Sequence, residues 1–301
     1  MENGKSYIRA EKDFINKWNT SFINTFKWKE LNNSTLRRDY FLKKIDISAP
    51  WHPIIFCNKL NNISEFIEES KVNFLEPFYF FMFVPEKSFE EKHLKKLFKE
   101  NILAHYIFIE NKSIKELFDK YKSRVRTKIR RGFKNFKFIK LNSIEELSNY
   151  EIEIRNLLIN QYLRLGSPCP PFELIKNLFK NKALNLYIVK FKNKLVGFIT
   201  MSTDKNISHV LWTVKSNNFK NNDLSICLFQ FCLEEAIKNK SKVFSLGTTN
   251  SKNLSKFKEQ LNAERAIYFK KKFNGSNQSL KLFSYVKSNR NKFFLLINNI
   301  I

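Results

Sequence analysis

The chain has 301 residues, a hydrophobic content of 43% and 32 phenylalanines, a composition that excludes an intrinsically disordered protein and suffices for one large or two modest domains. Its formal net charge of +26 suggests a polyanionic partner: nucleic acid, an anionic membrane surface or a phosphorylated substrate. The excess of Lys occurs together with an excess of Asn, Ile and Phe, which share A/T-rich codons. The base composition of the gene therefore explains the charge equally well.

The cysteines and histidines predict neither a metal site nor a disulfide framework. Four residues of each type are scattered without a CxxC pair or metal-ligand spacing, which is typical of a reducing compartment. The first twelve residues lack the apolar core of a signal peptide, and no apolar run approaches the ~18 residues of a membrane span. We expect a soluble, cytoplasmic protein. The apolar segment Phe293–Ile301 could touch a membrane surface, and packing of this tail on the core is the preferred alternative.

The first 112 residues predict alternating strands and helices. After a helical opening that contains Trp18 and Trp28, short aromatic or β-branched runs alternate with amphipathic segments. The predicted strands are Ile54–Cys57, Phe78–Val84 and Ala104–Ile109, and the predicted helices are Ile63–Val72 and Phe89–Glu100. This alternation is typical of an α/β layer with parallel neighbouring strands.

The segment from Lys122 to Gly132, KSRVRTKIRRG, holds four of the eleven arginines of the chain. Ser113 and Glu116 have the spacing of a capping box and predict the start of a helix, and Gly132 lies where that helix would end. Apolar residues recur at helical spacing, so one face packs on the body and the others carry cations. The planar guanidinium suits phosphate or carboxylate because it binds bidentately. A solvated basic helix face is the alternative.

The rest of the chain predicts a second run of strands and helices, and we place the domain boundary so that residues 1–112 form an N-terminal lobe and residues 113–301 a C-terminal domain. The predicted order is strand Phe136–Leu141, a helix from Ser143 to Gly166, helix Phe172–Asn181, strands Leu184–Phe191, Leu195–Thr203 and Ser208–Lys215, helix Leu224–Asn239, strand Val243–Gly247, helix Asn253–Leu261, strand Ala266–Phe273, and a hairpin at Asn274-Gly275 into Ser279–Val286. Short polar turns join the three consecutive strands, as in an antiparallel meander.

Four segments in this order resemble the Fem-type branch of the GNAT acyltransferase superfamily, which includes the peptidoglycan-bridge aminoacyltransferases. They are RTKIRR at 126–131, QYLRLG at 161–166, LVGFIT at 195–200, and FSLG at 244–247 with a downstream Phe257-Lys258 pair. The resemblance covers roughly residues 113–272. It implies an α/β fold of tandem GNAT-like domains, with a mixed sheet flanked by helices and a degenerate N-terminal copy.

The resemblance also implies roles for individual residues. Lys258 would lie near the acyl carbonyl and stabilise the negative charge of the tetrahedral intermediate, and Phe257 belongs to the same motif. The three arginines of the first motif, Arg126, Arg130 and Arg131, would hold phosphate of the donor or of the acceptor. For Lys258, one of 43 lysines, a merely solvated side chain is the alternative.

The end of the predicted strand Val243–Gly247 is a candidate site on physical grounds as well. Gly247, Thr248 and Thr249 precede a predicted helix, and α/β sheets bind ligands outside the carboxyl ends of their strands. Backbone N–H groups at the helix start favour an anion or a developing oxyanion. His209, on the strand expected to face that cleft, is a candidate base for the attacking amine. A histidine of the core is the preferred alternative.

Two departures from the family pattern concern the chemistry. Ser245 replaces the Asp of the F-D-F-G motif, which removes a carboxylate, and Asn262 replaces a Gly, although Asn tolerates left-handed backbone. The loop after Lys215 lacks the glycines with which acyl-CoA enzymes of the superfamily bind pyrophosphate. Lys215 and Lys220 could replace those backbone donors. The donor therefore stays open between acyl-CoA and an aminoacyl-tRNA.

We expect an N-acyltransferase that moves an acyl group from an activated (thio)ester, acyl-CoA in the first interpretation, to an amine on a cell-envelope or glycan precursor. No bound cofactor is expected, because acyl-CoA or aminoacyl-tRNA serves as a co-substrate. The acceptor could be nucleotide- or lipid-linked. A second interpretation is a tRNA-dependent aminoacyltransferase of peptidoglycan-bridge type. A third is a non-catalytic nucleic-acid-binding protein, whose affinity would fall uniformly with salt.

Overall fold

The computed structural model describes residues 7–32, 35–40, 43–47, 50–53, 55–57, 78–85, 101–217, 219 and 223–273. Several sequence-based predictions lie outside the described residues: the helices Ile63–Val72 and Phe89–Glu100, the hairpin at Asn274-Gly275, strand Ser279–Val286, the tail Phe293–Ile301, and Lys220.

The described residues form the strands and helices given below, and those of the C-terminal half follow the predicted order. The strands are β1 (Tyr7–Arg9), β2 (Lys29–Asn32), β3 (Thr35–Tyr40), β4 (Lys43–Ile47), β5 (Ile55–Cys57), β6 (Phe78–Pro85), β7 (Asn101–Phe108), β8 (Lys137–Lys140), β9 (Asn185–Phe191), β10 (Lys194–Thr203), β11 (Ile207–Lys215), β12 (Val243–Thr248) and β13 (Glu264–Phe273). The helices are α1 (Lys12–Phe26), α4 (Ile114–Asp119), α5 (Ser123–Asn135), α6 (Ile144–Ser148), α7 (Glu151–Leu165), α8 (Phe172–Lys180), α9 (Asp223–Lys238) and α10 (Lys252–Glu259).

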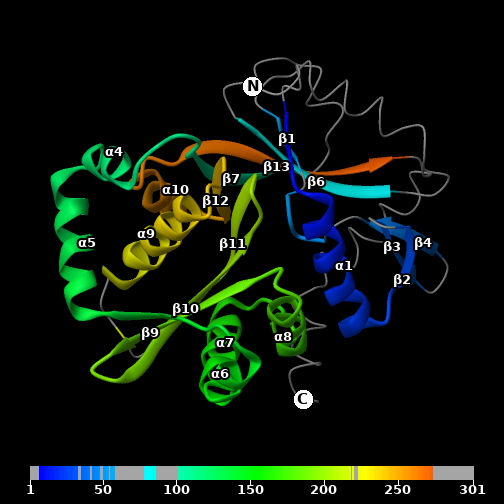
Figure 1. The fold of residues 1–301 in the computed structure, drawn as a ribbon, viewed down its shortest axis with the longest axis horizontal. Helices are drawn as coiled ribbons and strands as arrows, with labels where there is room; N and C mark the ends of the chain where they lie inside the picture. Colours follow the sequence, from blue (N-terminus) through cyan, green and yellow to red (C-terminus); the bar gives the residue numbers. More distant parts are fainter. Residues whose placement is uncertain are drawn as a thin grey trace.

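One mixed sheet connects both halves of the chain (Figure 1). Its order is β2-β3-β4-β6-β13-β7-β12-β11-β10-β9-β8, while β5 pairs with β6 and β1 with β5. β13 lies between β6 and β7 and is antiparallel to both. The sheet therefore continues across the boundary expected near residue 112, which falls between β7 and α4. The fold is the mixed α/β class that the sequence predicts.

The strand directions agree in part with the predictions. β9, β10 and β11 form the predicted antiparallel meander. In the first half, β5 is parallel to β6 as expected, and so is β4, a strand that the sequence analysis does not predict. The expectation of parallel neighbours is wrong for β7, which is antiparallel to β12 and β13. The physical reason is that β13, the last described strand, lies between β6 and β7 and separates them. β7 therefore pairs with β13 instead of β6.

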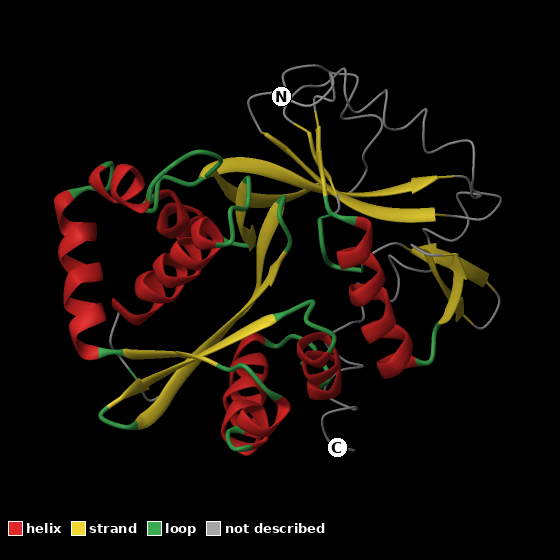
Figure 2. Cartoon of the chain, in the orientation of Figure 1, coloured by secondary structure: helices red, strands yellow, loops and turns green. Residues whose placement is uncertain are grey.

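Helices cover both faces of the C-terminal sheet. Figure 2 shows α5 and α9 on one side of β9 and β10, and α6, α7 and α8 on the other. Apolar residues of α1, α6, α7 and α8 form one buried cluster, and those of α4, α5 and α9 form another. Along β9, Leu186 and Ile188 belong to the first cluster and Tyr187 and Val189 to the second. This alternation is that of a strand buried on both faces.

The single helix predicted from Ser113 to Gly132 is divided into α4 and α5, and the arginines of the Arg-rich segment lie in α5. Ser113 caps α4 as expected, because its hydroxyl accepts the Glu116 N–H at 3.2 Å while the Glu116 carboxylate accepts the Ser113 N–H at 2.6 Å. The predicted end at Gly132 is wrong, since α5 continues past it. A Cβ on Gly132 would lie 2.1 Å from Cys227 Sγ of α9. Glycine is therefore needed for the close packing of these two helices.

The predicted helix from Ser143 to Gly166 is also divided, between α6 and α7. Its start is confirmed, because Ser143 Oγ accepts the Glu146 N–H at 3.2 Å, and its end is confirmed by Gly166 at φ 57°. Asn262, which stands where the resemblance expects glycine, has φ 55°. The left-handed conformation predicted to be tolerable there is the one observed.

Candidate active site

The candidate site lies where β11 and β12 separate (Figure 1). The two strands pair in parallel over only three residue pairs, the last of which is His209 with Ser245. Beyond this point β11 stays with β10, whereas β12 shifts register and pairs with β7 up to Thr248. Gly247, within the irregularity, has φ 76°, and a Cβ there would lie 2.9 Å from the Val210 carbonyl oxygen. Both features require glycine.

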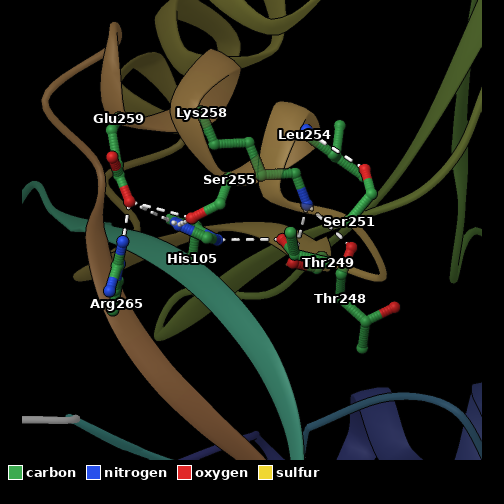
Figure 3. Close-up of polar contacts among 10 residues, drawn as sticks. His105, Thr248, Thr249, Ser251, Leu254, Ser255, Lys258, Glu259 and Arg265 are labelled. Carbon is green, nitrogen blue, oxygen red and sulfur yellow. Dashed lines mark hydrogen bonds and ion pairs between the residues drawn. The ribbon is translucent and has the colours of Figure 1, made fainter.

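Lys258 of α10 reaches this end of β12. Its ammonium donates hydrogen bonds to the carbonyl oxygens of Gly247 (2.9 Å) and Thr248 (2.8 Å), as Figure 3 shows. The residue is only 2% exposed, and burial lowers the pKa of its amine to about 7. The alternative of a merely solvated side chain is therefore wrong, because the side chain is buried. α10 packs close to the sheet, and the side chain fills the space between the two.

Within the described part of the chain, Lys258 makes two hydrogen bonds, and an ammonium has three N–H donors. The neighbouring Thr248 is exposed, while Gly247 and Thr249 are buried. The ammonium is therefore fixed by the backbone of a strand end at which only Thr248 is exposed. When protonated, an amine fixed in this way needs no rearrangement to stabilise negative charge on an oxygen placed beside it.

His209 belongs to the core. Its Nδ1 lies 2.9 Å from Ser245 Oγ, which also accepts the Gly247 N–H at 3.2 Å. The His209 ring meets that of His52 edge-on, with centroids 5.7 Å apart. Burial, followed by the charge of Lys258, lowers the pKa of His209 to about 3. The imidazole is therefore neutral and weakly basic at physiological pH, and this environment fits the alternative of a core histidine.

The three predicted arginines bind groups of the protein itself. Arg131 Nε donates a hydrogen bond to Oδ2 of the buried Asp223 carboxylate at 2.6 Å, and its Nη2 forms an ion pair with the same oxygen at 2.5 Å. The Arg130 guanidinium lies over an aromatic ring of α4, 5.4 Å from its centroid. Arg126 donates to a backbone carbonyl at the end of α4 at 2.9 Å. Because Asp223 lies in the first turn of α9, a phosphate at this helix start would meet a carboxylate already held there.

A pocket of ≈ 310 Å³ lies between α5, β11, α9 and α10. It is lined by Lys128, Lys215, Ser225, Ile226, Phe257 and Gln260. Lys215 and Phe257 were among the predicted residues. Lys128 lies within the RTKIRR motif, but the prediction named only the arginines of that motif. The two lysines, Lys128 and Lys215, supply positive charge to the pocket that suits an anionic ligand.

A second polar cluster adjoins Lys258 and was missed by the sequence analysis. The ring of His105, fully buried on β7, places Nδ1 2.9 Å from Thr249 Oγ1 and Nε2 3.2 Å from Ser255 Oγ. Glu259 accepts the Ser255 hydroxyl at 2.8 Å and the Arg265 guanidinium at 2.8 Å (Figure 3). Its members come from β7, the end of β12, α10 and β13. No spacing in the sequence connects position 105 with positions 249–265, so only the fold reveals the cluster.

Neither a metal site nor a membrane-spanning helix is present among the residues that the structure describes. No group of three or more His, Cys, Asp or Glu side chains there could hold a metal ion. No helix in these parts of the chain is both long and apolar enough to cross a membrane.

Comparison with known proteins shows the fold. No protein-family model and no curated protein matches the sequence. The structure is similar to FemX, with a TM-score of 0.57 and 10% identity over 91% of this chain and 93% of that one. It is also similar to a domain described as the C-terminal domain of a lysylphosphatidylglycerol synthetase from Agrobacterium fabrum, with a TM-score of 0.53 and 10% identity over 91% and 94%.

These likenesses concern architecture, because the identities are low. They extend over nine-tenths of the chain, including the N-terminal half, for which the sequence offered no motif. The chain therefore shares the fold of FemX and of this synthetase domain, which is the Fem-like fold that the four sequence segments predict.

Proposed function

We propose that this protein is an acyltransferase that moves an acyl group from an activated ester or thioester to an amine. The observation that carries the proposal is the position of Lys258, a buried ammonium anchored to the end of β12 where β11 and β12 separate. The Fem-like GNAT fold supports the same class of reaction.

The chemistry follows from this geometry. Attack of an amine on an activated carbonyl needs alignment, removal of one proton and stabilisation of the oxygen that becomes negative. A cation held by two carbonyl groups is already oriented, and in a buried setting its attraction for an oxyanion is poorly screened. Loss of one such group costs ~3 kcal/mol of transition-state stabilisation. Lys258 would supply this interaction through its third N–H.

The donor would enter through the pocket at the start of α9, where Lys128 and Lys215 face a phosphate-bearing ligand. Acyl-CoA is the donor we propose first, and Phe257 on the pocket wall would contact its thioester end. Arg131 is 60% exposed at its side chain while paired with Asp223, so it stays a candidate for a phosphate contact, together with Arg130. An aminoacyl-tRNA is the second candidate, favoured by the net charge of +26 and by the Fem-like fold.

The acceptor we propose is an amine on a cell-envelope or glycan precursor, linked to a nucleotide or a lipid. The fold is similar to that of a domain described as part of a lysylphosphatidylglycerol synthetase, and this similarity of fold is the only support that the comparison gives for a lipid-linked acceptor. The net positive charge of this protein suits the phosphate of either a nucleotide-linked or a lipid-linked acceptor.

Ligand-induced stabilisation tests the proposal. The thermal unfolding of the purified protein is measured with acetyl-CoA, with a charged tRNA or with a nucleotide-sugar amine. Unheated protein is then assayed for acyl transfer from a donor to an amine. A ligand at 100-fold its dissociation constant adds ~2.7 kcal/mol. Stabilisation by a donor and transfer to an amine would support the proposal. Binding to nucleic acid alone, weakening uniformly with salt and without transfer, would support the non-catalytic alternative.

A further inference from the structure

A continuous chain of hydrogen bonds leads from the end of β12 to the protein surface. It begins at Thr249 Oγ1, passes through both ring nitrogens of His105 and through Ser255 Oγ, and ends at Glu259 Oε1, with separations of 2.9, 3.2 and 2.8 Å (Figure 3). Thr249, His105 and Ser255 are buried, with exposures of 5%, 0% and 4%. Glu259 is 35% exposed at its side chain. The chain therefore connects a buried hydroxyl to water.

The direction of each hydrogen bond follows from the carboxylate at the outer end. Glu259 is an acceptor when ionised, so the Ser255 hydroxyl donates to it. The Ser255 oxygen then accepts from His105, which places the ring proton on Nε2. A neutral imidazole with its proton on Nε2 has a lone pair on Nδ1, so the Thr249 hydroxyl donates to His105. Each proton in this series of hydrogen bonds therefore points away from the end of β12.

The surroundings of His105 and Glu259 keep both groups in the protonation states that these hydrogen bonds require. Burial, then the charge of Lys258, lowers the pKa of His105 to about 4, and Glu259 and Arg265 act on the ring more weakly and with opposite signs. Hydrogen bonds from Arg265 and Ser255 hold the pKa of Glu259 below its usual value. At neutral pH the imidazole is therefore uncharged and the carboxylate is ionised, which are the states that the chain of donors requires.

The inner end of the chain adjoins the candidate oxyanion site. Thr249 follows Thr248, whose carbonyl group holds the Lys258 ammonium at 2.8 Å. The Thr249 backbone is fixed by a hydrogen bond from its N–H to the Leu103 carbonyl at 2.6 Å. An ammonium and a polarised hydroxyl thus flank one short backbone segment. The first suits the oxygen of a reacting carbonyl, and the second suits the proton of a reacting nucleophile.

We propose that Thr249, His105, Ser255 and Glu259 form a proton relay that removes the proton of the attacking amine, a role that rests on the proposed acyl transfer. As the amine nitrogen bonds to the carbonyl carbon, the carbonyl electron pair moves to the oxygen beside Lys258. The amine proton passes to Thr249 Oγ1, the Thr249 proton to His105 Nδ1, the Nε2 proton to Ser255 Oγ and the Ser255 proton to Glu259. One proton leaves the amine and one reaches the surface carboxylate, so His105 stays neutral throughout. Collapse of the intermediate expels the thiolate or alkoxide of the donor.

The first test is the tautomer of His105, read by ¹⁵N NMR on the full-length protein at pH 7. The relay requires the Nε2–H tautomer in the wild type. Glu259→Gln replaces the carboxylate by an amide of the same shape, and it should change the ¹⁵N shifts of His105. A proton on Nδ1 in the wild type would overturn the relay whether or not the protein transfers acyl groups.

The second test is kinetic, with the donor and amine that show turnover in the stabilisation panel. Thr249→Val removes the hydroxyl and keeps the shape of the side chain, so kcat should fall on the order of 100-fold with little change in KM. Thr249→Ser should restore most of the rate, which a structural role of the methyl group would not explain. Thr20→Val, a matched change on α1 far from the site, should be neutral. Wild-type kcat in Thr249→Val would overturn the proposal.

Glu259→Gln provides a second kinetic test if Thr249→Val does not fold. Its side chain is partly exposed, and the change should lower kcat by about 10-fold while circular dichroism stays that of the wild type. Unchanged kcat in this variant would overturn the relay. A protein that shows the Nε2–H tautomer but transfers no acyl group from any donor of the panel would contradict the proposed acyl transfer, and the catalytic role of the relay with it.

Discussion

The ammonium of Lys258 lies 2.8 Å from the carbonyl oxygen of Thr248 and thereby joins α10 to the end of β12. The same lysine donates to the Gly247 carbonyl at 2.9 Å. Two acceptors do not fully replace the hydration of a buried ammonium, and burial lowers the pKa of Lys258 to about 7. The cation thus occupies its position at a cost in stability, which makes its effect measurable.

The first prediction concerns stability against pH. Lys258 binds its proton less strongly in the folded chain than in the unfolded chain, where the pKa of a lysine is about 10.4. Between pH 7 and pH 10 the unfolded state therefore holds more protons, and the free energy of unfolding rises with pH. From pH 7.5 to 9 the gain should be about 2 kcal/mol. In Lys258→Met this contribution should vanish. Urea unfolding at both pH values checks it, and equal pH dependence in the two proteins would contradict it.

The second prediction concerns the contact between α5 and α9. Gly132→Ala places a Cβ 2.1 Å from Cys227 Sγ and should destabilise the protein by about 1–3 kcal/mol, because overpacked cores shift backbone and rotamers. Cys227→Ala removes the sulfur, so the double variant should lose much less than the sum of the two single changes. Denaturant unfolding of all four proteins gives the coupling energy. Simple additivity would show that the cost of Gly132→Ala does not come from contact with the Cys227 sulfur.

The third prediction concerns phosphate binding at the start of α9. Arg131→Lys keeps the charge but replaces a planar fork by a point donor, so the affinity for CoA should fall several-fold. Asp223→Asn removes the carboxylate that Arg131 now binds, and the affinity for CoA should rise. Arg155→Lys, on α7, is the matched control and should leave binding unchanged. Calorimetric titration with CoA measures all three. Equal affinities throughout would show that Arg131 has only a structural role, in its pair with Asp223.

The fourth prediction concerns the pH dependence of turnover. Because the pKa of His105 is lowered to about 4, the imidazole stays neutral well below the usual histidine range. The rate at saturating donor and amine should therefore show no decrease caused by histidine protonation between pH 7 and pH 5, after correction for ionisation of the amine. A loss centred near pH 6.5 that disappears in His105→Gln would contradict this prediction.

Much of the C-terminal half could be predicted from the sequence, because its signals are local. The capping residues Ser113 and Ser143, the left-handed end at Gly166 and the antiparallel meander depend on neighbours along the chain, and all are observed. The missed features depend on distant contacts. β2, β3 and β4 are short strands without a continuous apolar run. The place of β13 between β6 and β7 is set by the sheet as a whole.

The site shows the same division between local and distant signals. Gly247 and Lys258 were predicted from a motif and Thr248 from its place at a strand end, and the three lie together in the structure. The burial of Lys258 could not be predicted from the motif, because it depends on how closely α10 approaches β12. His105 could not be connected with Thr249 and Ser255, since the strand that carries it lies about 150 positions earlier in the chain. Its fully buried side chain is explained only by the tertiary fold.

The measurement that tests the account most directly is the turnover of Lys258→Ala with the donor and amine that the stabilisation panel identifies. Lys256→Ala, an exposed lysine on the same helix, is the matched control, and circular dichroism checks the fold of both. We predict that Lys258→Ala lowers kcat on the order of 100-fold with KM little changed, while Lys256→Ala keeps the wild-type rate. A folded Lys258→Ala protein with the turnover of the wild type would contradict the account.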